Sequence, residues 1–206
     1  MSTPAPVPVS PEAEPRVIKL LEGNSSIRIF DQIPECYHLS DDEFKRVWSL
    51  HPEERGIVKV FGKEHKTPRW MQSFGVPYKF SGVNHEAVPL TDPFLLKLKW
   101  MVETYTRFEY KQWLVNWYQD GKDKIGKHSD DETEIIPGSS IFSFSFGSER
   151  DIIFRSKKTD EKHTILMKNN SLIIMEGETN LYYTHEVPQR LKVLTPRINV
   201  TARRFK

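Results

Sequence analysis

Short runs in which apolar and polar residues alternate dominate the chain from Lys111 onward. The clearest run is Ile141-Phe142-Ser143-Phe144-Ser145-Phe146, which Gly147 ends. Because successive side chains of a strand point to opposite faces, this run predicts a strand with one apolar face. We expect further strands at 113–118, 152–154, 164–167, 171–175 and 198–201, a turn at Asp120-Gly121 and a hairpin turn at Asn169-Asn170.

Two helices are expected before these strands. Ser40 and Glu43 have the spacing of a capping box, which predicts a short helix through Trp48. Asp92-Pro93 opens a second helix, whose apolar stripe comprises Leu95, Leu98, Met101, Val102 and Tyr105. Many strands after an opening of helices predict an α+β, mainly β, architecture: a double-sheet jelly roll with flanking N-terminal helices.

The length of 206 residues predicts one domain, over 16–206, after a disordered proline-rich tail over 1–15. Cys36 is the only cysteine, so no intrachain disulfide can form and a reducing compartment is expected. No apolar run approaches the roughly 20 residues of a membrane span, and no signal-peptide core is present. We therefore expect an intracellular protein without membrane contact, acting as a monomer, and nuclear if its source is eukaryotic.

The formal net charge is only +2, but the basic residues are clustered. Residues 187–206 hold six Lys or Arg and no acid, and residues 58–70 hold Lys59, Lys63, Lys66 and Arg69 against Glu64. Two local clusters in a near-neutral protein fit a groove for a polyanion. Either cluster alone is also compatible with a solvated rim.

His128 and Asp130 are one residue apart, and His185 follows far along the chain. Residues i and i+2 of a strand face the same side, so His128 and Asp130 can share one metal, with His185 arriving from another strand. Two imidazoles and one carboxylate form the facial triad of non-haem Fe(II) oxygenases, which leaves coordination positions open for a co-substrate and oxygen. The sequence predicts an Fe(II) site, although other divalent metals accept the same ligands.

The order of motifs around this triad resembles the AlkB family of 2-oxoglutarate-dependent oxidative dealkylases. The motifs are Asn116-Trp117-Tyr118, His128-x-Asp130, Ser145-Phe146-Gly147, His185, and Arg197 through Arg203. The resemblance implies a double-stranded β-helix with Fe(II), 2-oxoglutarate and O2 as cofactors. It also implies that Arg197 clamps the distal carboxylate of 2-oxoglutarate and Arg203 meets its keto-acid end, with hydrogen bonds from Asn116, Tyr118 and Thr201.

A second set of motifs is similar to the branch of this family that repairs double-stranded DNA. They are Val60-Phe61-Gly62-Lys63, Pro68-Arg69 and Tyr78-Lys79-Phe80-Ser81-Gly82, within expected nucleotide-recognition hairpins at about 56–82. The resemblance implies repair of 1-methyladenine and 3-methylcytosine in duplex DNA, with release of an aldehyde, succinate and CO2. The alternatives are the same chemistry on RNA or single-stranded DNA, and a binding protein for modified nucleic acid that does not turn over.

Each substrate contact that the resemblance implies has a purely structural alternative. Phe61 is expected to fill the stack that a flipped base leaves, with Gly62 in the turn and Lys63 near phosphates; otherwise Phe61 is a core residue. Tyr78 and Phe80 are expected to hold the flipped base, beside Arg69 and Lys79, or to be core aromatics. Asp131 and Glu132 suit a base made cationic by alkylation, or they face solvent.

Three positions depart from the duplex-repair pattern. Ser129 replaces an Arg between the metal ligands, Thr184 replaces an aromatic residue before His185, and Ala202 replaces an aromatic residue after Thr201. These departures concern base discrimination and phosphate contact, not the metal and co-substrate signature.

Overall fold

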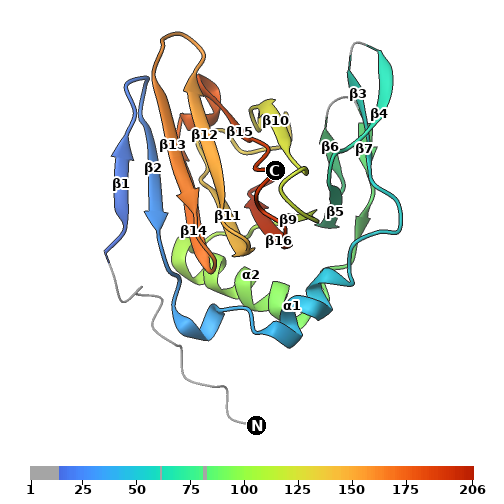
Figure 1. Cartoon of the computed structure of the whole chain (residues 1–206). Helices are drawn as coiled ribbons and strands as arrows, with labels where there is room; N and C mark the ends of the chain where they lie inside the picture. The colour runs from blue at the N-terminus through green and yellow to red at the C-terminus, as the bar shows by residue number, and fades with distance from the viewer. Residues whose placement is uncertain (1–13, 61, 81–82) are drawn as a thin grey trace.

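A computed structural model describes residues 14–60, 62–80 and 83–206. Two sheets face each other, which confirms the expected double-stranded β-helix (Figure 1). The larger sheet has the order β1 (Arg16–Lys19), β2 (Ser25–Phe30), β14 (Ser171–Gly177), β11 (Ile141–Gly147), β16 (Arg197–Arg203), β9 (Gln112–Tyr118), β5 (Trp70–Gly75) and β8 (Ala87–Val88). The smaller sheet has the order β10 (Ile125–His128), β15 (Tyr183–Val187), β12 (Arg150–Ser156) and β13 (Lys162–Met167).

Two separate hairpins stand on the opposite side of the molecule from β12 and β13 (Figure 1). One pairs β3 (Ile57–Val60) with β4 (Lys63–Lys66), and the other pairs β6 (Tyr78–Phe80) with β7 (Val83–His85). Nucleotide-recognition hairpins were expected at about 56–82; the two hairpins overlap this range and extend to His85, and their role in recognition stays a prediction. Phe61, Ser81 and Gly82 lie outside the described residues, as do the side chains of Lys59 and Phe80.

The alternation seen in the sequence separates a core face from a site face. On β11, Phe142, Phe144 and Phe146 pack in the core on the helical side of the large sheet, whereas Ser143 and Ser145 point between the sheets. The same split holds on β9 and β16, where Trp113, Val115, Trp117, Ile198, Val200 and Ala202 belong to the core on the helical side. The other face of these strands is therefore free to carry polar residues toward the space between the sheets.

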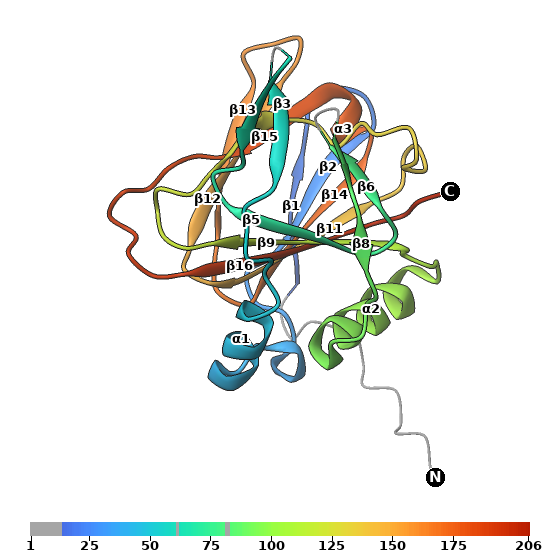
Figure 2. The same ribbon diagram turned by 90° about the vertical axis from the view of Figure 1, so that its right-hand side faces the viewer.

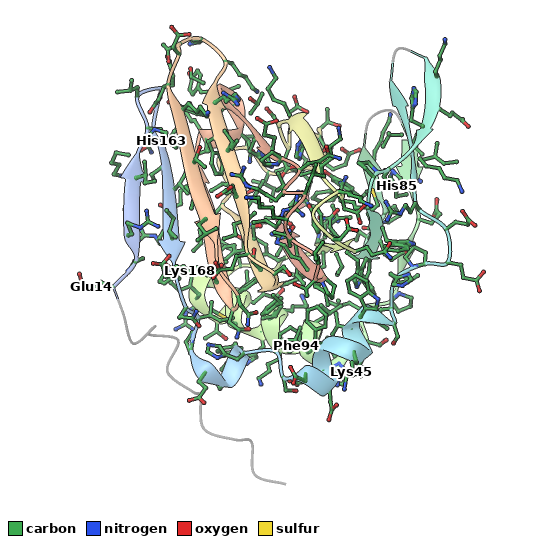
Figure 3. All side chains as sticks on the ribbon, in the orientation of Figure 1. Glu14, Lys45, His85, Phe94, His163 and Lys168 are labelled. Atoms are coloured by element: carbon green, nitrogen blue, oxygen red, sulfur yellow. The ribbon has the colours of Figure 1, made fainter. Side chains whose placement is uncertain are left out.

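Two main helices cover the outer face of the large sheet (Figure 2). Helix α1 (Asp41–Trp48) begins with the predicted capping box, and Asp92 caps α2 (Pro93–Thr106) through its side chain. Phe94, labelled in Figure 3, lies fully buried at the start of α2 against this sheet. Leu95, Leu98, Met101 and Val102 are buried as expected, but Tyr105 is 46% exposed. Two shorter segments complete the helices: η1 (Glu35–Tyr37) and α3 (Thr179–Tyr182).

Two local predictions were wrong. Asn169-Asn170 does not close a hairpin, because β13 and β14 belong to different sheets. Its hydrogen bonds go elsewhere: Asn169 Oδ1 accepts from the Gly147 amide and Asn170 Oδ1 accepts from the Leu39 amide. The His-x-Asp segment is not a continuous strand either, since β10 ends at His128.

The expected tail over 1–15 lies almost entirely outside the described residues, which begin at Glu14, and β1 begins at Arg16. Among the helices of the described ranges, none has the length and apolar character needed to cross a membrane.

Candidate active site

The two histidines of the predicted triad lie directly opposite each other on neighbouring strands. His128 ends β10 and pairs in register with His185 on β15. Asp130 follows in the loop after β10, and one ligand atom from each of the three residues lies within 4.8 Å of the others. His128 Nε2 lies 3.6 Å from Asp130 Oδ1. The structure thus brings together all three expected metal ligands, although Asp130 reaches them from a loop.

The protonation states suit a divalent cation. Burial lowers the pKa of His185 to about 3 and also lowers that of His128, so both imidazoles are neutral at pH 7. Burial by itself raises the pKa of Asp130, but the charge and hydrogen bond of Arg203, together with the electrostatic effects of His185 and His128, outweigh burial and lower that pKa to about 2. Two neutral nitrogens and one carboxylate are the ligand forms that bind ferrous iron.

The hydrogen bonds of His128 and Asp130 are compatible with metal binding. His128 Nδ1 donates to the carbonyl oxygen of Gly126 at 2.9 Å, which leaves the lone pair on Nε2. Asp130 Oδ2 accepts from Arg203 at 3.0 Å, whereas its buried Oδ1 has no hydrogen-bond partner among the described residues. A buried carboxylate oxygen without a partner is costly, so this atom fits a metal ligand.

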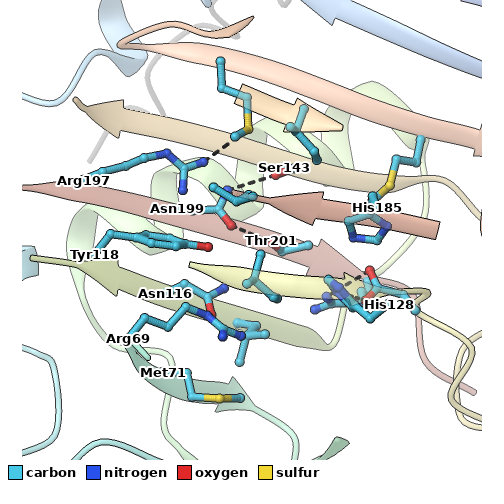
Figure 4. A pocket seen from close by; sticks show the side chains of 18 of the residues that line it. Arg69, Met71, Asn116, Tyr118, His128, Ser143, His185, Arg197, Asn199 and Thr201 are labelled. Atoms are coloured by element: carbon cyan, nitrogen blue, oxygen red, sulfur yellow. Dashed lines mark hydrogen bonds and ion pairs between the residues drawn. The ribbon is translucent and has the colours of Figure 1, made fainter. Parts of the chain in front are cut away.

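A cavity extends from the triad between the two sheets (Figure 4). All five residues expected to bind 2-oxoglutarate line it: Asn116, Tyr118, Arg197, Thr201 and Arg203. They come from β9 and β16, adjacent strands whose inward residues alternate with the core residues described above. The alternating pattern of these two strands therefore places every predicted co-substrate residue on one wall.

Arg197 is a buried cation whose donors are only partly used. Its side chain is 1% exposed, and Nη2 donates to Ser145 Oγ at 2.9 Å. Nε and Nη1 make no hydrogen bond within the described residues, and the guanidinium lies 4.8 Å from the centre of the Tyr118 ring. Burial lowers its pKa to about 10, which still leaves it charged at pH 7. Two free donors on a buried cation fit the carboxylate of 2-oxoglutarate.

Arg69 belongs to the basic cluster over 58–70 but, unlike Lys63 and Lys66, it is buried. It is 3% exposed, lines the cavity, and donates from Nε to Asn116 Oδ1 at 2.6 Å. The reason is its place directly before β5, which runs beside β9 inside the sheet. Lys63 and Lys66 are exposed as expected, and Lys66 pairs with Glu54 at 2.6 Å.

Sequence reasoning missed Met71, Ser143 and Asn199, which line the cavity, and the hydrogen bond that Ser145 accepts from Arg197. Asn199 donates from Nδ2 to Ser143 Oγ at 2.9 Å, and Thr201 Oγ1 donates to Asn199 Oδ1 at 3.3 Å. The sequence pattern could have identified them. Ser143 and Ser145 are the polar members of the strictly alternating run, and Asn199, two residues after Arg197, points to the same face of its strand.

Of the residues expected to contact the substrate, Arg69 and Tyr78 line the cavity, and Glu132 contacts Tyr78. Tyr78 is 1% exposed and donates from its hydroxyl to Glu132 Oε1 at 2.7 Å, and its ring centre is 4.9 Å from the Arg203 guanidinium. Burial, together with the charge of Asp130, raises the pKa of Glu132. Asp131 and Lys79 are exposed, and Gly62 has a φ of +75° that favours glycine.

The profile of the 2OG-Fe(II) oxygenase superfamily matches residues 42–203, which include the triad and the three arginines that line the cavity. The chain belongs to this superfamily. Within it, the chain is a member of the AlkB family and is similar to DNA oxidative demethylase ALKBH2. It is 40% identical to that protein from Mus musculus, over 72% of this chain and 66% of the relative, and 39% identical to that from Homo sapiens, over 72% and 60%. It is 34% identical to alkB homolog 3 from Mus musculus, over 66% and 51%.

This member of the 2OG-Fe(II) oxygenase superfamily spans about three fifths of the length of the ALKBH2 proteins it matches. A solved structure of OsALKBH1 shares the fold, with a TM-score of 0.59 at 17% identity, over 86% of this chain and 97% of that one. Superfamily membership agrees with the donor set of the cavity: the triad can hold Fe(II), and Arg197 can hold 2-oxoglutarate.

Proposed function

We propose that this chain is a DNA oxidative demethylase that repairs N-alkylated bases, such as 1-methyladenine and 3-methylcytosine, in duplex DNA. It would act as a monomer, and in the nucleus if its source is eukaryotic. The observation that carries the proposal is one cavity with the metal triad at one end and the part-satisfied Arg197 on its wall. The names of the relatives that are 39–40% identical support DNA as the substrate class.

When bound, Fe(II) and 2-oxoglutarate supply the oxidising chemistry, in which O2 hydroxylates an alkyl carbon on a base nitrogen and CO2, succinate and then an aldehyde are released. His128, Asp130 and His185 would hold the metal. Arg197 would pair with the distal carboxylate of the co-substrate through Nε and Nη1, which make no hydrogen bond within the described residues. Arg203 would approach the keto-acid end while keeping its hydrogen bond to Asp130.

The remaining residues of this wall would orient the co-substrate. Asn116, Tyr118 and Thr201 offer hydrogen-bonding groups along the cavity, and the burial of all three excludes water from the reacting groups. Arg69 adds a third buried positive charge to those of Arg197 and Arg203, and it lies beside Asn116. Together, Arg69 and Arg197 make the cavity selective for a dianionic co-substrate.

Recognition of the base would fall to the segments beside the metal. Glu132 holds the Tyr78 hydroxyl, and exposed Asp131 places negative charge near a base that alkylation has made cationic. Arg69 lies in the adjoining wall. The proposal also assigns Phe61 to the stack vacated by the flipped base and Phe80 to the base itself, with Gly62, Lys63 and Lys79 beside the phosphates.

The test is incubation with Fe(II), ascorbate and 2-oxoglutarate on matched oligonucleotides carrying 1-methyladenine in a duplex or in a single strand. Loss of one methylene mass, faster on the duplex, is the expected result. Repair of the single strand alone would identify single-stranded nucleic acid, and not the duplex, as the substrate. Binding without any mass loss or succinate would favour a non-catalytic reader, and it would overturn the proposal.

A further inference from the structure

Gln112 is a fully buried polar residue that lies behind the site and not in it. It is 0% exposed, and it is not among the residues that line the cavity. Its neighbours on the site face of β9, Leu114, Asn116 and Tyr118, all line the cavity. A buried side-chain amide is costly unless both its oxygen and its nitrogen are paired, so its two partners indicate its role.

Both partners of Gln112 are specific side chains. Oε1 accepts from Arg203 Nη1 at 3.0 Å, and Nε2 donates to Ser73 Oγ at 3.1 Å. Arg203 uses its other terminal nitrogen, Nη2, to donate to Asp130 Oδ2 at 3.0 Å. Arg203 thus bridges Gln112 and the metal ligand Asp130, and all three side chains are at most 3% exposed.

The sheet register explains why glutamine reaches both partners. Gln112 is directly opposite Arg203 on β16 and directly opposite Gly75 on β5. Because Gly75 has no side chain, the Gln112 amide can extend diagonally to Ser73, two residues before it. Gly75 has a φ of +87°, and a Cβ there would lie 2.3 Å from the Lys111 carbonyl oxygen, so a larger residue is excluded.

We propose that Gln112 is a positioning residue for the metal ligand Asp130, acting through Arg203. A guanidinium held by one acceptor can turn about its own bonds, whereas one held at both terminal nitrogens keeps its plane and its distance from the carboxylate. The network orients Asp130 Oδ2 and so leaves Oδ1 facing His128. This inference rests on the proposed function only in taking the triad as a metal site.

The same network extends to the segment that carries Tyr78. Ser73 Oγ donates to the carbonyl oxygen of Val76 at 2.7 Å, in the turn between β5 and β6. The Tyr78 ring then lies against the Arg203 guanidinium. Gln112 therefore holds Arg203 by a hydrogen bond at Nη1, while the ring of Tyr78, the first residue of the β6–β7 hairpin, packs against its guanidinium.

The experiment measures Mn(II) affinity of the metal-free chain by calorimetry, without co-substrate and without turnover. Gln112→Met removes the acceptor at nearly constant volume and is expected to weaken Mn(II) binding by about tenfold or more, as for other partners of metal ligands. Gln112→Glu keeps an acceptor for Arg203 and is expected to retain wild-type affinity. The matched control is Gln72→Met on β5, where Nε2 donates to the carbonyl oxygens of Ser73 and Glu86.

A folded Gln112→Met with wild-type Mn(II) affinity would overturn the inference, as would an equal loss in Gln72→Met. If Gln112→Met does not fold, Ser73→Ala takes its place, because it frees the Gln112 amide. It is expected to weaken Mn(II) binding, and unchanged affinity would then overturn the inference. Failure of the wild-type chain to bind Mn(II) would overturn the proposed function, and this inference with it.

Discussion

The Tyr78 hydroxyl donates a hydrogen bond of 2.7 Å to Oε1 of Glu132, joining the β6–β7 hairpin to the loop that follows the metal ligand Asp130. Tyr78 begins the hairpin that is proposed to contact the substrate, and Glu132 lies in the loop that carries Asp130. The contact therefore brings the expected substrate face to the metal.

Tyr78→Phe removes this hydrogen bond and keeps the ring beside Arg203. Because Glu132 would lose its partner in a largely buried position, we expect a loss of about 1–3 kcal/mol in the free energy of unfolding. The kcat/KM for the alkylated duplex is expected to fall, with Mn(II) affinity unchanged. Urea unfolding and steady-state kinetics measure the two effects, and wild-type values of both would contradict the assignment.

Arg197→Lys preserves the charge but removes the planar fork. Loss of one charge-assisted hydrogen bond costs about 1.5–3 kcal/mol, so we expect the KM for 2-oxoglutarate to rise about 10- to 100-fold. The matched control is Arg28→Lys, which alters an arginine paired with Glu176 on β14. Equal KM values in the two variants would remove Arg197 from co-substrate binding.

The metal-free protein is expected to lose stability as the pH falls below 6.5. Burial lowers the pKa of His185 from 6.5 to about 3 in the folded state, so the unfolded state binds one more proton between these values. Stability from this group is complete above pH 6.5 and declines by about 1.4 kcal/mol per pH unit below it. Urea titrations from pH 7 to pH 4 measure the slope. His185→Gln should flatten it, and an unchanged slope would assign the proton to another group.

Phe61→Ala is expected to impair repair of 1-methyladenine in a duplex far more than in a single strand. A single strand has no stack to fill, so the loss should be confined to the duplex. Phe108→Ala is the control, since Phe108 is 51% exposed on the segment after α2. Equal losses on both substrates would exclude a wedge role for Phe61.

Residue patterns that depend on one strand were predictable. The strict alternation of Phe142 to Phe146 located both faces of β11. The resemblance to the AlkB family singled out Arg197 and Arg203, and their even spacing on one strand agrees with their place on one wall of the cavity. The capping box at Ser40 predicted α1 because a cap depends on residues only three positions apart.

Features that depend on which strands become neighbours were not predictable. Arg69 looked like one of several exposed basic residues, and only the pairing of β5 with β9 places it beside Asn116. Gln112 carried no local signal at all, since its role depends on Arg203 and Ser73, which lie 91 and 39 positions away in the chain. Asn169-Asn170 has the composition of a hairpin turn, but the chain changes sheets there.

His128 and His185 belong to the small sheet, whereas Arg197 and Arg203 belong to the large one. Neither sheet carries a complete site, so the site forms only when the two sheets pack face to face. A partial opening that left every strand intact would separate the metal ligands from the arginines. On heating, loss of activity should therefore precede the loss of the β-sheet circular dichroism signal, because the site depends on the interface between the two sheets and not on either sheet alone.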